Sequence, residues 1–492
     1  MADPLVQVSG ASPFLGCTAD NVPGQSGTVF LNSEVEPWID VNPGDTDNIV
    51  GIWQADRWSN GGARGLVAGV SFDGGSSWVQ PVVIPGITDC SGGIYDRSTD
   101  PWVSFSPNGV VHQLALSFND VAPPFVEGLG GDFDHALLAS KSTDGGLTWS
   151  TPEEVIRDLD ANVFNDKQSI TADPFDSDLV YAVWDRLVFP PSERASVISG
   201  FVSLAFRGPA WFARTTDGGD SWDPAREIFD PGQNSQTIAN QIVVLPNGDL
   251  VNIFDLRTIR RPIDPRPGQP PLFTVDRAAI LRSTDQGETW SRNAIVIDRM
   301  KTIGVEDPET GDEVRVGDII PDIAVDAGTG DLYAVWQDAR FNDFEADAIA
   351  FSRSTDGGFT WSSPIQVNQT PSDVPIGNRQ AFTASVDVAD DGTVAVTYYD
   401  FRNNTPDPET LATDYFVVHC HPDEADCTDP VGWEEEVQLT DVSFDMRKAP
   451  FARGFFVGDY VGLASVGNDF TAFFSQSRGT DPASTFYRRV GP

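Results

Sequence analysis

Short runs of alternating apolar and polar residues recur along the whole chain, with turn-forming residues between them. Residues 321–325, 332–336 and 364–368 are one such set, rich in Val, Ile, Leu and Trp. Runs of this length, separated by clusters of Gly, Pro, Asn and Asp, predict β-strands joined by turns. No long helix-forming run interrupts the pattern, so the sequence predicts an all-β protein.

A turn motif repeats at nearly constant intervals and groups the expected strands into units. Its first copy reads SFDGGSSW over residues 71–78, and successive copies lie 68 to 73 residues apart. A period of this size fits a four-stranded blade of a β-propeller. The repeated aspartates are Asp73, Asp144, Asp217, Asp285 and Asp356.

The motif has a simple turn chemistry. The Asp carboxylate can accept backbone N–H bonds, the glycines supply positive φ, and the Trp five residues after the Asp covers the turn. At these residues the chain resembles the sialidase superfamily, whose Asp-box is also called the bacterial neuraminidase repeat. The resemblance implies a β-propeller with its active site on the side away from the Asp-boxes.

The chain ends in a unit that lacks one strand, and the missing strand is found at the other end. Segments 460–465, 470–474 and 484–488 supply three strands, while the N-terminal PLVQVS at 4–9 matches the outer strand at 364–368. Pairing the two ends removes exposed sheet edges. The sequence therefore predicts one domain over 1–492, a propeller of seven four-stranded antiparallel blades in which strand 4–9 completes the last blade at 453–490. The alternative is six blades.

Acidic residues greatly outnumber basic ones. The 73 Asp and Glu against 31 Lys and Arg give a net charge of −42, which would repel nucleic acid and anionic membrane surfaces. Neither is expected as a partner. No apolar run reaches the roughly 18 residues of a membrane span, and the N-terminus lacks signal-peptide features, so a soluble mature chain is expected. No cofactor is expected beyond structural calcium, which the many carboxylates would suit.

Four cysteines indicate two disulfides. Cys420 and Cys427 bracket a short acidic loop that replaces an Asp-box, which suits a local disulfide, and Cys17 and Cys90 make the second pair. Disulfides predict an oxidising compartment and hence a secreted protein. A metal site that adds His419 and His421 to Cys420 and Cys427 is the less favoured alternative.

Candidate site residues lie in loops at one end of the expected ring, before the first strand or after the second strand of each unit. Long connections at 187–209 and 258–277 are expected to overhang a central cleft. Ion pairs that only hold the ring together are the alternative interpretation of these charges. The loops include Glu36, Arg97, Asp100, Asp166, Lys167, Arg257, Arg379, Asp459 and Tyr460.

The resemblance to sialidases extends to some of these residues. It implies that Asp100, in STDP at 98–101, is the acid/base and that Tyr460, in GDYVGL at 458–463, is the nucleophile. Arg379 and Arg257 match arginines that hold the substrate, and Arg97, Glu36 and Asp459 complete the candidate binding residues. Asp100 as a residue that caps the start of its strand, and Tyr460 as a core aromatic, are the structural alternatives.

Two departures argue against sialidase activity itself. The stretch Glu34-Val35-Glu36-Pro37 stands where the family has its first arginine, and no carboxylate occurs near Ala239 and Asn240, where the assisting glutamate is expected. Glu34 and Glu36 would repel a substrate carboxylate. We therefore expect a monomeric glycoside hydrolase or lyase-like propeller that acts on a glycan. A non-catalytic glycan-binding or surface-structural propeller is the alternative.

Overall fold

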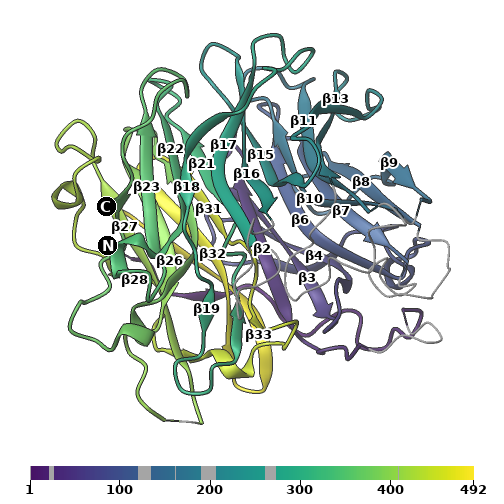
Figure 1. Ribbon diagram of the computed structural model, residues 1–492. Helices are drawn as coiled ribbons and strands as arrows, with labels where there is room; N and C mark the ends of the chain where they lie inside the picture. Colours follow the sequence, from purple (N-terminus) through teal and green to yellow (C-terminus); the bar gives the residue numbers. More distant parts are fainter. Residues whose placement is uncertain are drawn as a thin grey trace.

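The computed structural model describes residues 2–20, 27–119, 134–160, 162–189, 207–260, 273–407 and 409–492. The described chain is almost entirely β-structure, and its helices are short 3-10 turns. Twisted antiparallel sheets follow one another through the molecule in chain order (Figure 1). The long connections expected at 187–209 and 258–277 lie largely outside the described residues. No helix among the described residues is long and apolar enough to span a membrane.

Four strands pair antiparallel, in chain order, in each of the first units. The first strand of each unit is its inner strand, because it contacts the first strand of the next unit. The first three units are β2 (Glu34–Val41), β3 (Asn48–Arg57), β4 (Ala63–Phe72) and β5 (Val79–Val83); β6 (Arg97–Phe105), β7 (Val111–Phe118), β8 (His135–Ser142) and β9 (Glu153–Asp158); and β10 (Val163–Ala172), β11 (Val180–Val188), β13 (Ala210–Thr215) and β14 (Arg226–Phe229).

The later units repeat this order. Two-residue and three-residue strands outside the units are β12 (Arg207–Gly208), β19 (Val305–Glu306), β20 (Glu313–Arg315), β29 (Phe444–Asp445) and β30 (Phe455–Phe456). The fourth to sixth units are β15 (Ser235–Val244), β16 (Leu250–Arg260), β17 (Phe273–Ser283) and β18 (Ile295–Met300); β21 (Asp322–Val325), β22 (Leu332–Asp338), β23 (Ala348–Ser354) and β24 (Ile365–Gln366); and β25 (Ala381–Val388), β26 (Val394–Asp400), β27 (Ala412–Cys420) and β28 (Val437–Gln438).

The last unit is built from both ends of the chain. It contains β31 (Gly462–Val466), β32 (Asp469–Arg478), β33 (Asp481–Val490) and the N-terminal β1 (Val6–Gln7). Val6 lies opposite Tyr487, and the backbone of the buried Val8 bonds to Thr485. Its inner strand β31 contacts both β25 and β2, so the inner strands follow one another in a closed ring.

The hydrophobic core lies between neighbouring units. One cluster combines Val50 and Leu66 of the first unit with Val103 and Ala115 of the second, all of them buried. A single sheet cannot cover its own apolar faces, so each unit depends on its neighbours for burial. Within the described residues the 3-10 helices lie in the connections: η1 (Asp89–Ser91), η3 (Ala339–Asn342), η4 (Ile376–Arg379), η5 (Pro430–Gly432) and η6 (Met446–Lys448).

The repeated turns carry a dense set of hydrogen bonds. In the first, both Asp73 carboxylate oxygens accept from Ser77, one from its backbone N–H at 2.8 Å and the other from its hydroxyl at 2.6 Å. These bonds favour the ionised form and lower the pKa of Asp73. Gly74 and Gly75 both have positive φ, and Trp78 donates from its ring nitrogen to the Gly75 carbonyl. The same carboxylate pattern occurs at Asp144, Asp217, Asp285 and Asp356.

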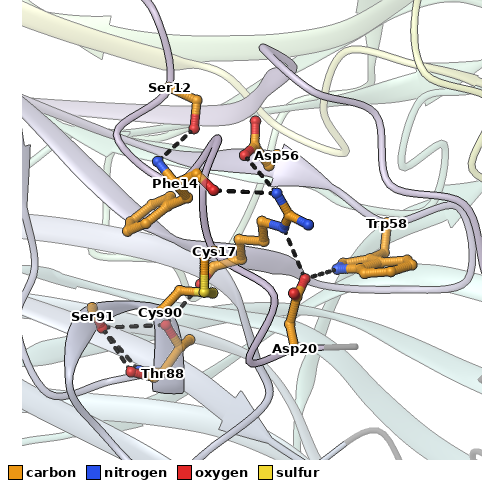
Figure 2. Close-up of a disulfide and its surroundings, with 10 residues drawn as sticks. Ser12, Phe14, Cys17, Asp20, Asp56, Trp58, Thr88, Cys90 and Ser91 are labelled. Atoms are coloured by element: carbon orange, nitrogen blue, oxygen red, sulfur yellow. Dashed lines mark hydrogen bonds and ion pairs between the residues drawn. A yellow bond between two sulfur atoms is a disulfide. The ribbon is translucent and has the colours of Figure 1, made fainter. Parts of the chain in front are cut away.

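Both predicted disulfides are present. Cys420 bonds to Cys427, and Cys17 bonds to Cys90, which ties the N-terminal segment to the loop after β5. Figure 2 shows the Cys17–Cys90 disulfide near Asp20, whose carboxylate forms a buried ion pair with Arg64. Asp20 also accepts a bond from the Trp58 ring nitrogen at 2.8 Å. Since the four cysteines are paired in two disulfides, they cannot serve as thiolate metal ligands.

Candidate functional site

The inner strands of several units share an irregularity near their starts. The pairing register shifts there, as between Val35 and Trp38 and between Thr99 and Trp102. At each shift one non-glycine residue has a positive φ, an uncommon conformation that stores strain and often marks a functional position. These residues are Glu36, Asp100, Lys167, Ala239 and Thr383, with φ between 46° and 57°.

Three carboxylates from separate units bind one ammonium group. The Lys167 Nζ atom donates to Asp100 Oδ1 at 2.6 Å, to Asp459 Oδ2 at 2.7 Å and to Glu36 Oε1 at 3.1 Å. The three carboxylate side chains are at most 5% exposed, and Lys167 is 14% exposed. We call these four residues the lysine cluster. They lie on β2, β6 and β10 and just before β31, so the ring of inner strands brings them together.

Two arginines extend this network. Arg315, from the connection between the fourth and fifth units, holds Asp459 with two bonds, Nε to Oδ1 at 3.0 Å and Nη2 to Oδ2 at 2.5 Å. Arg57, at the end of β3, donates to Gln54 Oε1 at 2.7 Å, and Gln54 in turn bonds to Glu36. Burial lowers the pKa of Arg57 to about 10. The buried carboxylates are therefore matched by basic groups nearby.

The charges and burial within the lysine cluster shift the pKa values of its members in different directions. Burial would lower the pKa of Lys167, but the attraction of Asp100, Asp459 and Glu36 outweighs it and raises that pKa well above its usual value. Burial would raise the pKa of Asp459, but Arg315 and Lys167 hold it well below its usual range. For Glu36, burial and the charge of Asp100 raise the pKa to about 7 despite Lys167.

A cavity of about 930 Å³ lies beside the lysine cluster. Lys167 and Asp459 form part of its wall, whereas Asp100 and Glu36 do not line it. Connections after β18 and β24 supply much of the remaining wall. Its ionisable residues include Asp166, Glu306, Glu313, Arg315, Asp318 and Arg453.

Tyr460 lines a narrower space between the inner strands, together with Lys167 and Asp459. Its ring packs with Trp38 and Trp102, at centroid distances of 6.0 and 5.6 Å, and its hydroxyl donates to the Pro101 carbonyl at 3.4 Å. Burial, with Glu36 and Asp100 nearby, raises the pKa of Tyr460 well above 10. The hydroxyl is therefore protonated at neutral pH.

The structure brings together four of the seven candidate residues. Glu36, Asp100 and Asp459 meet at Lys167, and the Lys167 ammonium also lies 5.5 Å from the centroid of the Tyr460 ring. These residues are separated by as many as 424 positions in the sequence. Only the closure of the ring makes them neighbours.

The three candidate arginines lie apart from this cluster and bind other protein groups. Arg97 donates to Asn60 at 2.7 Å and to the Gly61 carbonyl at 2.8 Å, and stacks over Trp58. Arg257 pairs with Asp276 at 2.5 Å, and Arg379 donates to the Val374 carbonyl at 2.9 Å. None of the three lines either of the two cavities.

The sequence predicts no specific role for two central residues: Lys167, which is named only among the loop residues, and Arg315, which is not among them. Lys167 stands at the same step of its inner strand as Glu36 and Asp100, and a comparison of the inner strands would have singled it out. Arg315 lies in a connection with no counterpart in the other units, so the repeat pattern carries no signal for it.

Comparisons with known proteins give only distant similarity. No protein-family model and no curated protein matches the chain. Among solved structures, a Hadza microbial sialidase matches at 15% identity and TM-score 0.47, covering 90% of this chain and 73% of that one. A Penicillium chrysogenum alpha-L-arabinanase complexed with arabinobiose matches at 12% identity and TM-score 0.47, covering 81% and 94%. These scores are too low to transfer an activity to this chain.

Proposed function

We propose that the protein is a secreted, sialidase-like Asp-box propeller that acts on a glycan, with seven blades in one domain over residues 1–492. The closed ring of inner strands and the pairing of β1 with β33 support the blade arrangement. The hydrogen-bonded turns at Asp73 and its counterparts support the Asp-box assignment. Two disulfides support an oxidising, extracellular location.

The observation that carries the proposal is the convergence of Glu36, Asp100 and Asp459 on Lys167 beside the 930 Å³ cavity. Burying several charges is costly, and strained backbone adds to the cost, so such a group is typical of a functional site. Glycoside cleavage needs carboxyl groups with different protonation states at one bond. We assign Asp100 as acid/base, Tyr460 as its partner, and Glu36 and Asp459 as sugar-binding groups.

The assignment of Asp100 has a direct test. Purified protein is incubated with β-glucan, xylan, galactan, chitin oligomers and polygalacturonate, and products are detected by mass spectrometry. We expect cleavage of at least one neutral glycan, and a loss of about 100-fold or more in Asp100→Asn if it transfers the proton. Asp178→Asn, an exposed carboxylate in the β10–β11 turn, is the matched control. Full activity in Asp100→Asn would remove this residue from the catalytic role.

The alternative proposal is a non-catalytic glycan-binding or surface-structural propeller. One observation favours it: the Asp100 and Asp459 carboxylates are held by Lys167 and Arg315, and the Tyr460 hydroxyl is bonded to the Pro101 carbonyl. Side chains held in this way connect separate units and stabilise the closed ring of inner strands. Calorimetry that detects glycan binding without any product would support the alternative over the hydrolase.

A further inference from the structure

The connection between β18 and β21 carries two glutamates that the lysine cluster does not use. Glu306 on β19 and Glu313 on β20 lie directly opposite each other in an antiparallel pair. Both line the 930 Å³ cavity, unlike Asp100 and Glu36. β19 is labelled in the lower half of Figure 1.

The hydrogen bonds around Glu306 and Glu313 show which kind of antiparallel pair they form. The Asp307 N–H donates to the Asp312 carbonyl, and Glu306 exchanges both of its backbone bonds with the Gln380 side chain instead of with Glu313. Glu306 and Glu313 are therefore a non-hydrogen-bonded pair, the closer of the two antiparallel arrangements. Side chains of such a pair point to the same face, with Cβ atoms roughly 4.5–5.5 Å apart.

The ribbon that carries the glutamates is held on both sides. β20 also pairs in parallel with β30, where Val314 lies opposite Phe455, and the Gln380 amide fixes β19. Two neighbours of Glu313 are themselves in the cavity wall, Arg315 and Asp318. The pair thus stands on a small sheet instead of a free loop, which suits precise placement of reacting groups.

The two carboxyl groups have different surroundings. Glu313 is half-buried, and burial and the charge of Asp318 raise its pKa to about 7, with Arg315 opposing the shift. Glu306 is exposed to solvent. Among the described residues, no basic side chain forms an ion pair with either, in contrast to Asp100 and Asp459, which are held by Lys167. A carboxyl group with a raised pKa and a solvent-exposed carboxyl group, both lining the same cavity, form the unequal pair that acid/base catalysis requires.

We infer that Glu313 is the proton donor and Glu306 the nucleophile for cleavage of a glycosidic bond in this cavity, in place of Asp100 and Tyr460, an inference that rests on the proposed glycan-cleaving function. The Glu313 proton passes to the glycosidic oxygen, which keeps the electron pair of the broken bond to C1. The Glu306 carboxylate forms an ester bond to C1. Water, deprotonated by Glu313, then replaces Glu306 at C1 and restores both carboxyl groups. A retaining mechanism needs its two carboxyl groups close together, and a directly opposed cross-strand pair brings them to the same face.

The experiment compares Glu306→Gln, Glu313→Gln and Glu153→Gln, an exposed control on β9, with methyl and 2,4-dinitrophenyl glycosides of glucose, galactose, xylose and N-acetylglucosamine. We expect Glu313→Gln to lose about 100-fold or more on the methyl glycoside that the wild type cleaves. Its loss in kcat/KM on the dinitrophenyl glycoside should stay below about tenfold, because that leaving group needs no proton, whereas kcat should fall because Glu313 no longer activates the water. Glu306→Gln should lose activity on both, and the product should keep its anomeric configuration.

Failure of the inference and failure of the proposed function give different results. Cleavage that survives in Glu306→Gln and Glu313→Gln but is lost in Asp100→Asn would overturn the glutamate pair and leave the hydrolase in place. No cleavage by the wild type of any glycoside would overturn both. Independently of turnover, 13C NMR of the glutamate carboxyl groups should show a titration near pH 7 that Glu313→Gln removes, beside the one expected from Glu36. A spectrum without that titration would contradict the assignment of Glu313.

Discussion

At the scale of single residues, the ammonium group of Lys167 joins side chains from several units. It is the shared partner of Glu36, Asp100 and Asp459, and these carboxylates have almost no access to water. Removing one partner of a buried ion pair is far costlier than losing an exposed pair, because the remaining charge stays buried. The strain of the positive φ at Lys167 is offset by these bonds.

Lys167→Met should therefore lower the free energy of unfolding by roughly 3–5 kcal/mol at neutral pH. The loss should be smaller at pH 5, because Glu36, whose pKa is raised to about 7 by burial and the charge of Asp100, is protonated there and no longer needs a cationic partner. Urea unfolding at pH 5 and pH 8 measures both values, with the exposed Lys448→Met as control. An equal loss at both pH values would show that charge repulsion is not the cause.

Asp347 allows a separate test of buried carboxyl groups. It is fully buried and bonded to Ile303 N–H, Thr302 and Gln337, and burial raises its pKa to about 7. The folded protein then holds a proton that the unfolded chain has released, so stability falls as pH rises between about 4 and 7, by at most about 1.4 kcal/mol per pH unit. Asp347→Asn should flatten this part of the stability curve measured by urea unfolding. A curve with unchanged slope would exclude Asp347 as its source.

At the scale of elements, the two disulfides close loops of very different length. Cys17 and Cys90 are separated by 73 residues, and Cys420 and Cys427 by 7. Longer closed loops restrict the unfolded chain more, so the Cys17–Cys90 bond should contribute roughly 4 kcal/mol and the Cys420–Cys427 bond roughly 2.5 kcal/mol. Calorimetry of the two double Cys→Ser variants measures the difference. A larger loss from the Cys420–Cys427 pair would mean that local packing dominates over chain entropy.

The strand β1 is the second element with a clear test. Val8, just after it, is 1% exposed, and Ser9 Oγ accepts from the Thr485 N–H at 2.8 Å. Deleting residues 1–10 uncovers the outer edge of β33 and removes this burial, worth about 1.5–3 kcal/mol for a single Val side chain. The melting temperature should fall by several degrees, whereas Pro4→Ala, at an exposed position, should leave it unchanged. No fall would mean that β1 does not stabilise the last unit.

Pairings and contacts could be predicted from the sequence where a local motif or the repeat marks them. The pairing of Val6 with Tyr487 follows the similarity between segments 4–9 and 364–368, and the Cys420–Cys427 bond follows from its short loop. The grouping of Asp100 with Tyr460 follows from the ring closure. The bond between Arg315 and Asp459 spans 144 positions and involves a connection outside the repeat, so no periodic pattern announces it. Arg379 donates to the nearby Val374 carbonyl instead of joining the lysine cluster, and the sequence pattern carries no signal for this contact.

At the scale of the whole molecule, hydrogen bonds join the inner strands of successive units into a belt. Asp40 of β2 accepts from Phe105 N–H of β6, Ser104 of β6 accepts from Ala172 N–H of β10, and Thr171 of β10 donates to the Ile242 carbonyl of β15. Asp322 of β21 then accepts from Ser385 and Val386 of β25. The belt and the lysine cluster both bridge several units, so the position of the candidate site depends on the whole ring instead of one blade.

The two chain ends lie side by side in Figure 1, and Ala2 bridges to Val490 in the last unit. The same closed ring could therefore be formed by a chain that begins and ends at a different unit. A short linker could join residue 492 to residue 1, and the chain could be opened instead in a surface connection between two blades, such as residues 230–234 between β14 and β15. A circular permutant of this kind would hold every blade, including the last, within one uninterrupted stretch of polypeptide, and the site at Lys167 would be assembled from the same neighbours.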